Sequence, residues 1–298
     1  MKKLLSLVLV LILAVSLVAC TGTTETGTDK IPSVGGNTDN TPAPGTPSNQ
    51  EITLAQTVIY DANDVKITAT GMDDSGFFGP GVKVLIENNA AKDLTIQARE
   101  SAVNGAMIDT MFSETVAAGK KANATITFSE SELNTAGINT IKNIEFKIIL
   151  LDANSYDTVA TSETIALTTS ADTSFTQTFD STGSVLYDGD GIKVVAKKLS
   201  SEDSFWGSEL YLYIENNTQK YLTIQARDVS INGFMVNPSF SCDILPGKVA
   251  YSSITFFESD LTDNGITDIS ELELKLYIFE AETWDTVKET DIIKISFN

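Results

Sequence analysis

Histidine is absent from this 298-residue chain, and cysteine occurs only twice. Without histidine the chain lacks the commonest general base and metal ligand of proteins, which disfavours triad hydrolysis and zinc chemistry. No glycine-rich phosphate loop follows a strand-like segment. A glycosidase-type pair of carboxylates remains compatible with a composition this acidic. We expect a protein that is not an enzyme and that uses no cofactor or metal.

Positive charge is also scarce. Lysine and arginine together number 20 against 40 acidic residues, and the formal net charge is −20. A negative net charge of this size keeps a protein soluble and repels other polyanions. We therefore expect no nucleic-acid partner.

The N-terminal segment, residues 1–19, has the layout of a secretory signal. Lys2 and Lys3 precede an apolar run at 4–15 that is short for a membrane span, and Leu-Val-Ala-Cys follows at 17–20. This ending resembles the lipobox of bacterial lipoproteins. The resemblance implies cleavage before Cys20, acylation of its thiol (as with palmitate), and anchoring to the lipid bilayer on the extracellular face of a bacterial cell membrane. The alternatives are an uncleaved transmembrane helix and ordinary secretion.

Residues 20–50 are rich in Thr, Gly, Ser, Pro and Asn and contain almost no large apolar side chain. This composition predicts a disordered tether, with a root-mean-square reach of about 30 Å. With Cys20 acylated, the other cysteine, Cys242, has no partner for a disulfide within the chain. We expect Cys242 to be a small, partly buried residue without a reactive role.

An internal repeat organises the remaining sequence. Ile-Glu-Asn-Asn at 86–89 and Leu-Thr-Ile-Gln-Ala-Arg at 94–99 recur at 214–217 and 222–227 with the same spacing. Self-similarity of this length indicates two copies of one folding unit. We predict a first copy at 51–170 and a second copy at 176–298, joined by a Ser/Thr-rich junction at 168–184.

Each copy alternates apolar and polar residues with the period of a strand that has one buried face. Asn-Gly at 104–105 and 232–233 predicts type I′ hairpin turns. One short helix per copy is expected, at 131–137 and 259–265. The acidic segments 61–64 and 188–191 are interpreted as turns that enter strands, with a calcium loop as the alternative. The predicted fold is all-β, with two tandem immunoglobulin-like antiparallel β-sandwich domains.

Several segments carry a resemblance to a known family. They are the two repeated motifs, the Asn-Gly turns, Pro-Gly-Lys at 246–248 and Thr-Trp-Asp-Thr at 283–286. They resemble the immunoglobulin-like domains found in tandem on lipoproteins of Gram-positive bacteria. The resemblance implies the sandwich fold and no particular activity.

The only arginines, Arg99 and Arg227, occupy equivalent positions in the two copies. Alternation places each with Gln97 or Gln225 on the face opposite the apolar row. An ion pair within the domain is the first interpretation, because the guanidinium fork suits a carboxylate. The shared candidate partners are Glu145 and Glu273, or Asp157 and Asp285. Direct contact between arginine and a ligand is the alternative.

The second copy differs from the first in its aromatic residues. Tyr211, Tyr213, Tyr277 and Phe279 replace Lys83, Leu85, Ile149 and Leu151. We expect these aromatics to share one outer face, where they could form a binding platform or be covered by the first domain, by a third layer or by a second molecule. Trp284 is expected to lie in the core. The candidate ligand-binding residues are Tyr211, Tyr213, Gln225, Arg227 and Tyr277.

These patterns together predict a membrane-anchored, non-catalytic binding module. Its expected partners are the bilayer, through Cys20, and either a cell-wall polysaccharide or a surface protein. The alternatives are a structural spacer or envelope accessory protein, and a carbohydrate-binding module.

Overall fold

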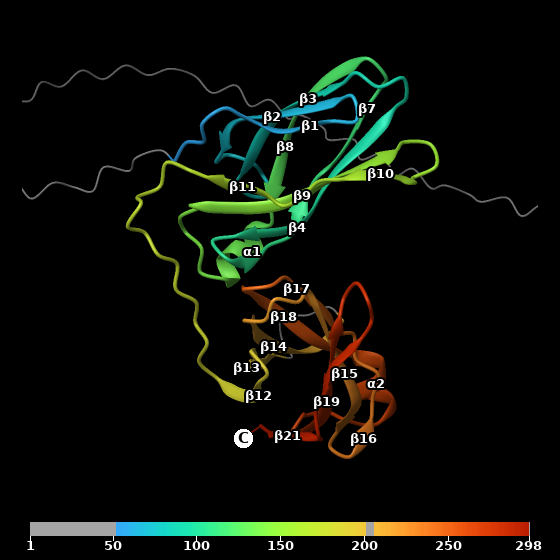
Figure 1. Ribbon diagram of the computed structural model, residues 1–298. Helices are drawn as coiled ribbons and strands as arrows, with labels where there is room; N and C mark the ends of the chain where they lie inside the picture. The colour runs from blue at the N-terminus through green and yellow to red at the C-terminus, as the bar shows by residue number, and fades with distance from the viewer. Residues whose placement is uncertain (1–51, 201–205, 298) are drawn as a thin grey trace, which may run out of the picture. The chain divides into compact units, whose positions relative to one another are not determined.

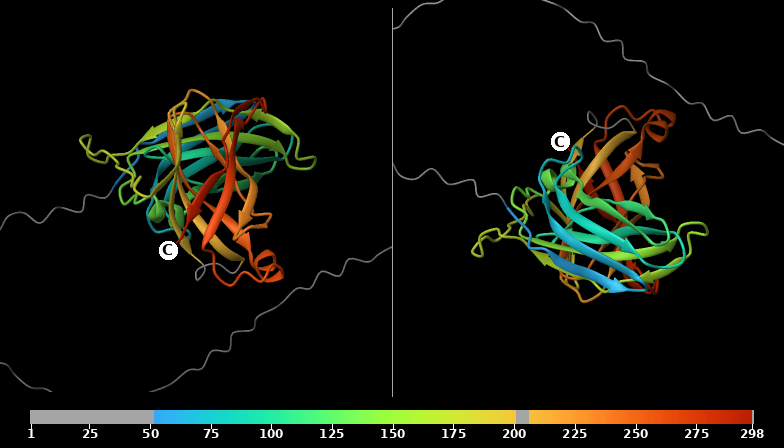
Figure 2. Two further views of the ribbon diagram at one scale, coloured as in Figure 1. Left: turned by 90° about the horizontal axis from the view of Figure 1, so that it is seen from below. Right: turned by 90° about the horizontal axis from the view of Figure 1, so that it is seen from above.

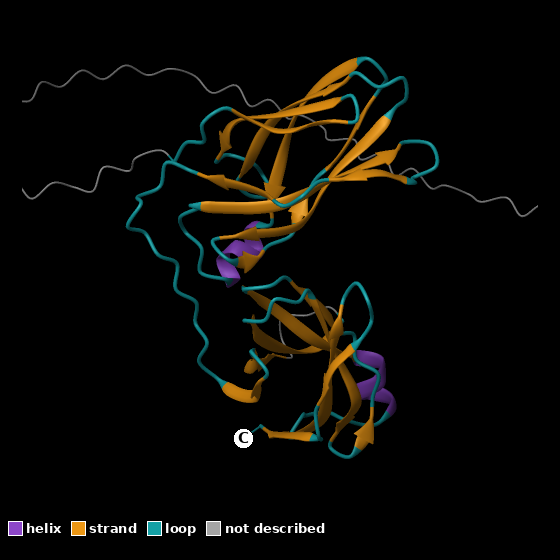
Figure 3. Cartoon of the chain, in the orientation of Figure 1, coloured by secondary structure: helices purple, strands orange, loops and turns teal. Residues whose placement is uncertain are grey.

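The computed structural model describes residues 52–200 and 206–297, so the signal segment, Cys20 and the predicted tether lie outside the described residues. Strands dominate the described part, accompanied by two helices of six residues each (Figure 3). No helix in 52–200 or 206–297 is long and apolar enough to cross a membrane. The predicted all-β fold is confirmed.

The first copy contains eleven strands and one helix (Figure 1). They are β1 (Thr57–Ala62), β2 (Val65–Asp73), β3 (Gly81–Asn88), β4 (Leu94–Val103), β5 (Ala106–Met107), β6 (Thr110–Met111), β7 (Ser113–Val116), β8 (Lys120–Phe128), α1 (Glu130–Thr135), β9 (Asn143–Asp152), β10 (Thr158–Thr161) and β11 (Ile165–Thr168).

The described part of the second copy repeats most of this order. Its elements are β12 (Ser184–Gly189), β13 (Ile192–Ser200), β14 (Gly207–Asn216), β15 (Leu222–Ile231), β16 (Phe234–Met235), β17 (Ser241–Ile244), β18 (Lys248–Phe257), α2 (Glu258–Asp263), β19 (Glu271–Glu280), β20 (Thr286–Glu289) and β21 (Ile293–Ser296). These strands fall within the predicted second copy, and those of the first copy fall within the predicted first.

Each copy is a two-layer sandwich (Figures 1 and 2). In the first copy one layer has the order β1-β2-β3-β8-β6, and the other is built on the antiparallel pair β4 and β9. In the second copy the layers are β12-β13-β14-β18 and the sheet built on β15 and β19. Alternate side chains of facing strands fill the space between the layers, which is how a sandwich forms its core. The rows Ile144, Phe146, Ile148, Leu150 and Leu272, Leu274, Leu276, Ile278 are completely buried there.

The hydrogen-bond register also recurs. The β4–β9 ladder shifts between Arg99 and Ala102, and the β15–β19 ladder shifts between Arg227 and Ser230. At each shift the residue after the arginine, Glu100 or Asp228, has φ of +50°. Such bulges bend a strand locally and re-aim the side chains beside them.

The repeated Asn-Asn motif has a structural role in each copy. Asn216 is completely buried at the end of β14 and donates from Nδ2 to the carbonyls of Lys220 (2.8 Å) and Ile244 (3.0 Å). Its Oδ1 accepts hydrogen bonds from the backbone N–H and the hydroxyl of Thr218. Asn88 binds the equivalent groups of the first copy. The motif therefore ties the strand end to the loop that follows and to the opposite layer.

The predicted Asn-Gly turns are confirmed, because Asn104, Gly105, Asn232 and Gly233 all have positive φ between hydrogen-bonded strands. The acidic segments also form turns, between β1 and β2 and between β12 and β13. The short helices begin one residue earlier than expected, and neither has a side-chain capping bond. Gly137 and Gly265 follow them with φ near +66°, which closes each helix.

Gln50–Asn298 forms one compact unit. A single parallel bridge between Ala106 of β5 and Val249 of β18 joins a sheet of the first copy to a sheet of the second. Beside it, Lys248 Nζ donates to Glu145 Oε1 at 2.6 Å. The hydrophobic core of the first copy continues into Tyr213 and Val249.

Candidate functional site

The five predicted ligand-binding residues do not form one face. Tyr211 and Tyr213 lie on β14, in one layer of the second copy, whereas Gln225, Arg227 and Tyr277 lie on β15 and β19, in the other layer. The outward sides of two packed sheets point in opposite directions. The prediction of a shared outer face is therefore wrong, although each tyrosine does point away from the core of its own sandwich.

Tyr213 is not available to a ligand. Its side chain is 4% exposed and packs edge to face on Tyr251, with ring centroids 5.5 Å apart. Burial and the nearby Glu215 carboxylate raise the pKa of Tyr213 to about 12. Of the alternatives considered for these aromatics, cover by the first domain is the one that applies to Tyr213, since it belongs to the core cluster of that copy.

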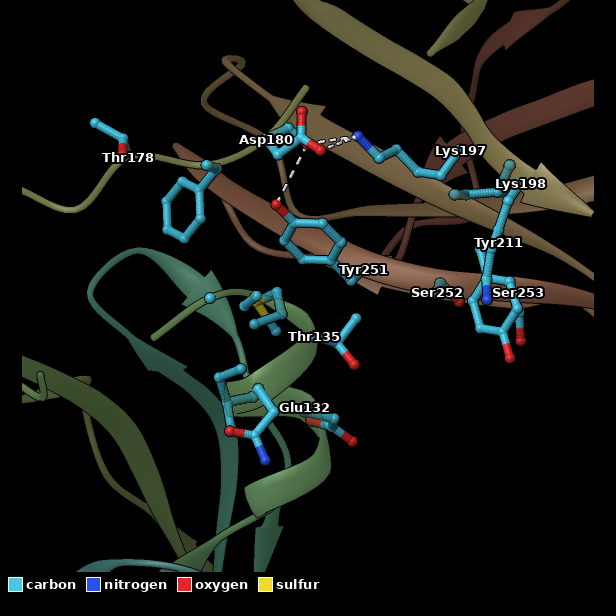
Figure 4. Close-up of a pocket in the computed structure, with 17 residues that line it drawn as sticks. Glu132, Thr135, Thr178, Asp180, Lys197, Lys198, Tyr211, Tyr251, Ser252 and Ser253 are labelled. Carbon is cyan, nitrogen blue, oxygen red and sulfur yellow. Dashed lines mark hydrogen bonds and ion pairs between the residues drawn. The ribbon is translucent and has the colours of Figure 1, made fainter. Parts of the chain in front are cut away.

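Tyr211 lines a hollow of about 990 Å³ bounded by α1, residues 178–180 and strands β13, β14 and β18 (Figure 4). The Lys198 ammonium lies over the Tyr211 ring, 5.0 Å from its centroid. Lys197 donates to the Asp180 carboxylate at 2.7 Å, and this bond, together with bonds from Thr182, lowers the pKa of Asp180 strongly. Of the charges that border this hollow, Lys197 and Asp180 are thus paired with each other, and Glu132 accepts a hydrogen bond from the backbone N–H of Asp109.

A second cluster lies on the outward side of β19 and β15. We call it the aromatic strip: Arg227, Tyr277, Phe279 and Trp284. The Arg227 guanidinium lies on the Tyr277 ring, with Cζ 3.4 Å from the centroid, close enough for a cation–π interaction. Tyr277 is 5.3 Å from Phe279, and Phe279 stacks on Trp284 at 5.2 Å and 15°. Two flat groups, a guanidinium and an indole, are therefore each supported by a ring of the same strand.

Trp284 was expected in the core, and that expectation is wrong. Its side chain is 71% exposed, at the turn between β19 and β20. The backbone there has φ of +65°, held by hydrogen bonds from Trp284 N to Glu280 O (2.9 Å) and from Glu280 N to Asp285 O (3.0 Å). A positive φ is unusual for a bulky residue. It turns the indole back over the outer face of the sheet instead of into the sandwich.

The expected ion pairs of the arginines are also wrong. In the first copy, Arg99 Nη2 and Nε donate to Gln97 Oε1 at 3.0 and 3.3 Å. Within 52–200 and 206–297 neither arginine forms an ion pair that the structure records, and Glu145 and Glu273 bind Lys248 and Lys294 instead. Gln225 lies opposite Tyr277 in the ladder and is half-buried.

The strip can stack on a planar or ring-shaped ligand and donate hydrogen bonds. The carboxylates recorded next to the strip, Asp228 and Glu289, bind Lys275. Among the described residues no group of three or more Cys, Asp or Glu is placed to hold a metal ion. Trp284 and Phe279 were missing from the predicted set. The sequence does carry a signal for them, because both positions hold a larger aromatic group in the second copy: Phe279 stands where the first copy has Leu151, and Trp284 stands where it has Tyr156.

No family model matches the chain, and no curated protein matches it either. Among solved structures it is similar to the YadV chaperone (13% identity, 78% of this chain and all of that one, TM-score 0.24). It is also similar to a chain of the Salmonella enterica SafA pilin–SafB chaperone complex (11%, 80% and 98%, TM-score 0.23). A third match is a protein of unknown function from Porphyromonas gingivalis W83 (10%, 83% and 99%, TM-score 0.19). Similarities of this size assign neither a family nor a function.

Proposed function

We propose that the chain is a lipoprotein of the outer face of a bacterial cell membrane and acts there as a non-catalytic binding module. Acylation of Cys20 would anchor it, and residues 20–50 would hold the folded part away from the bilayer. Two acyl chains suffice for lasting attachment, because each buried CH₂ contributes about 0.8 kcal/mol. The lipobox-like segment and the composition of the tether support this part of the proposal.

The ligand site we propose is the aromatic strip of the second copy. The observation that carries it is Trp284, which has one ring face packed on Phe279 and remains 71% exposed. Leaving so large an aromatic surface in water forgoes about 1.5–3 kcal/mol of burial, and the fold gains no core contact in return. An exposed, rigidly supported tryptophan is typical of residues that dominate binding energy. The exposed aromatic of the equivalent turn in the first copy, Tyr156, has no such ring recorded beneath it among the described residues.

The test is co-sedimentation of residues 50–298 with purified Gram-positive cell walls and with insoluble polysaccharides. Wild type is compared with Trp284→Ala and with Tyr156→Ala. Tyr156 is a matched control, because it occupies the equivalent turn of the first copy with φ of +62° and is 70% exposed.

We expect saturable binding that Trp284→Ala weakens about 30-fold, the effect of losing a hot-spot residue worth about 2 kcal/mol, while Tyr156→Ala leaves it unchanged. Binding lost equally in both variants would refute the strip as the site. Absence of binding by the wild type, to walls and to polysaccharides, would favour a spacer or a protein partner.

A further inference from the structure

We infer that the aromatic strip binds a polysaccharide that carries carboxylate groups, with the carboxylate on Arg227 and the face of a sugar ring on Trp284. This inference rests on the proposed function and names the ligand class of the same site. It follows from comparing how the two copies use one equivalent arginine.

The two copies hold their arginines differently. Arg99 directs two N–H groups to Gln97 Oε1, so its donor fork is used within the domain. In the second copy Tyr277 stands where the first has Ile149, and the guanidinium of Arg227 lies over that ring with Cζ 3.4 Å from its centroid. Stacking uses the face of a guanidinium and leaves the N–H groups at its edge directed outward. The planar edge of Arg227 matches a carboxylate through two parallel hydrogen bonds.

The two carboxylates recorded beside Arg227, Asp228 and Glu289, bind Lys275 and not Arg227. Lys275 is directly opposite Arg227 in the β15–β19 ladder, and like charges opposite each other are unfavourable. The Lys275 ammonium is compensated by Asp228 at 2.8 Å and by Glu289 at 3.7 Å. Arg227 has no recorded carboxylate partner within the described residues, although the chain contains 40 acidic residues. A ligand carboxylate would give the Arg227 guanidinium the direct partner that Asp228 and Glu289 give to Lys275.

Trp284 supplies the second contact. The indole is parallel to Phe279 within 15°, so one of its faces is packed and the other is open to solvent. Because the indole is stacked on Phe279 and its backbone turn is hydrogen-bonded, less side-chain freedom is lost on binding than for an unsupported indole. Sugar rings present flat C–H faces, which displace water from an aromatic face of this kind. Phe279 and Tyr277 lie on one strand face with ring centroids 5.3 Å apart, so one ligand chain can contact both Trp284 and Arg227.

The net charge of −20 opposes a polyanion at long range. Its effect is screened beyond about 8 Å at 0.15 M ionic strength, whereas a carboxylate in contact with Arg227 is well inside that distance. Binding should therefore be measured near 0.15 M salt and should not weaken steeply as salt is added, in contrast to binding driven by a basic surface.

The experiment is isothermal titration of residues 50–298 with polygalacturonate oligomers, with the same oligomers fully methyl-esterified, and with neutral cello-oligosaccharides. The ester keeps the ring faces and removes the charge. The variants are Arg227→Gln and Trp284→Ala, and the matched controls are Arg99→Gln and Tyr156→Ala, whose thermal unfolding should match that of the wild type.

We expect the acid form to bind and Arg227→Gln to weaken it about tenfold or more, as expected for a hydrogen bond to a charged group. The ester should bind weakly to the wild type and equally to Arg227→Gln. Equal binding of acid and ester, or equal effects of Arg227→Gln and Arg99→Gln, would overturn the inference. So would the absence of any binding to the acid form. If cell-wall binding still depends on Trp284 in those cases, the proposed function stands and only the ligand class is wrong.

Discussion

Replacing Asn216 with alanine should destabilise the second copy more than most surface substitutions, and about as much as loss of a large core side chain. The side chain is completely buried, and it satisfies the carbonyls of Lys220, Ile244 and Leu245 and the N–H of Thr218 at 2.8 to 3.1 Å. The bond to Ile244 is itself buried, so water cannot replace it without entering the core. Each buried partner left unsatisfied costs about 1–3 kcal/mol. With the other partners in reach of water, we expect a loss of about 2–4 kcal/mol in the free energy of unfolding.

Asn217→Ala is the matched control for this substitution. Asn217 is the next residue and is exposed, and its amide donates to Glu215 at the surface, so its loss should cost less than about 0.5 kcal/mol. Urea unfolding of residues 50–298, followed by the fluorescence of Trp206 and Trp284 in the second copy, measures both values. If Asn216→Ala and Asn217→Ala differ by less than about 1 kcal/mol, the buried amide is not the tie between loop and layers that we describe.

Other predictions concern alkaline pH and one glycine. Burial is the main cause that raises the pKa of four groups, all in the second copy, to about 12: Cys242, Tyr187, Tyr213 and Tyr221. Because the folded state keeps protons that the unfolded chain releases from about pH 9–10, stability should be unaffected below pH 9 and fall between pH 9 and 12. The thiol of Cys242 should accordingly resist Ellman's reagent at pH 8 until urea unfolds the chain; rapid labelling of the native protein would contradict this. A Cβ added at Gly207 would lie 2.0 Å from the Phe256 carbonyl oxygen, whereas a Cβ added at Gly233 would contact nothing. We therefore expect Gly233→Ala to lower the free energy of unfolding by ~1 kcal/mol and Gly207→Ala to lower it by several times as much. Thermal unfolding of the two variants measures the difference. Equal shifts for the two glycine variants would show that the loop relaxes freely.

The strand pattern could be read from the sequence because it is a local property. Alternation of Leu272, Leu274 and Leu276 with polar neighbours requires a half-buried strand whatever lies opposite. The Asn-Gly pairs specify their turns because few other residues accept two positive φ angles in succession. Repetition of both signals at one spacing was enough to predict two sandwiches of the same design.

The site could be predicted only in part. The alternation of apolar and polar residues along each strand indicates that Tyr211, Tyr213 and Tyr277 point away from a core. It does not indicate which layer of the sandwich each strand joins. Which outward face is then covered depends on what packs against it, and the first copy covers Tyr213.

Trp284 shows the same limit within a turn. A bulky aromatic in a chain of alternating strands is expected in the core, and a left-handed backbone at a single residue directs it to the surface. The sequence by itself therefore determined the strands, the turns, the repeated unit and the arginines that face away from the core. Only the tertiary structure decided which aromatics are open and which guanidinium is stacked on a ring, with no ion pair recorded for it within 52–200 and 206–297. The side of a strand on which a side chain lies is set by its neighbours in the chain, whereas the exposure of that side chain is set by residues that are distant in sequence and pack against it.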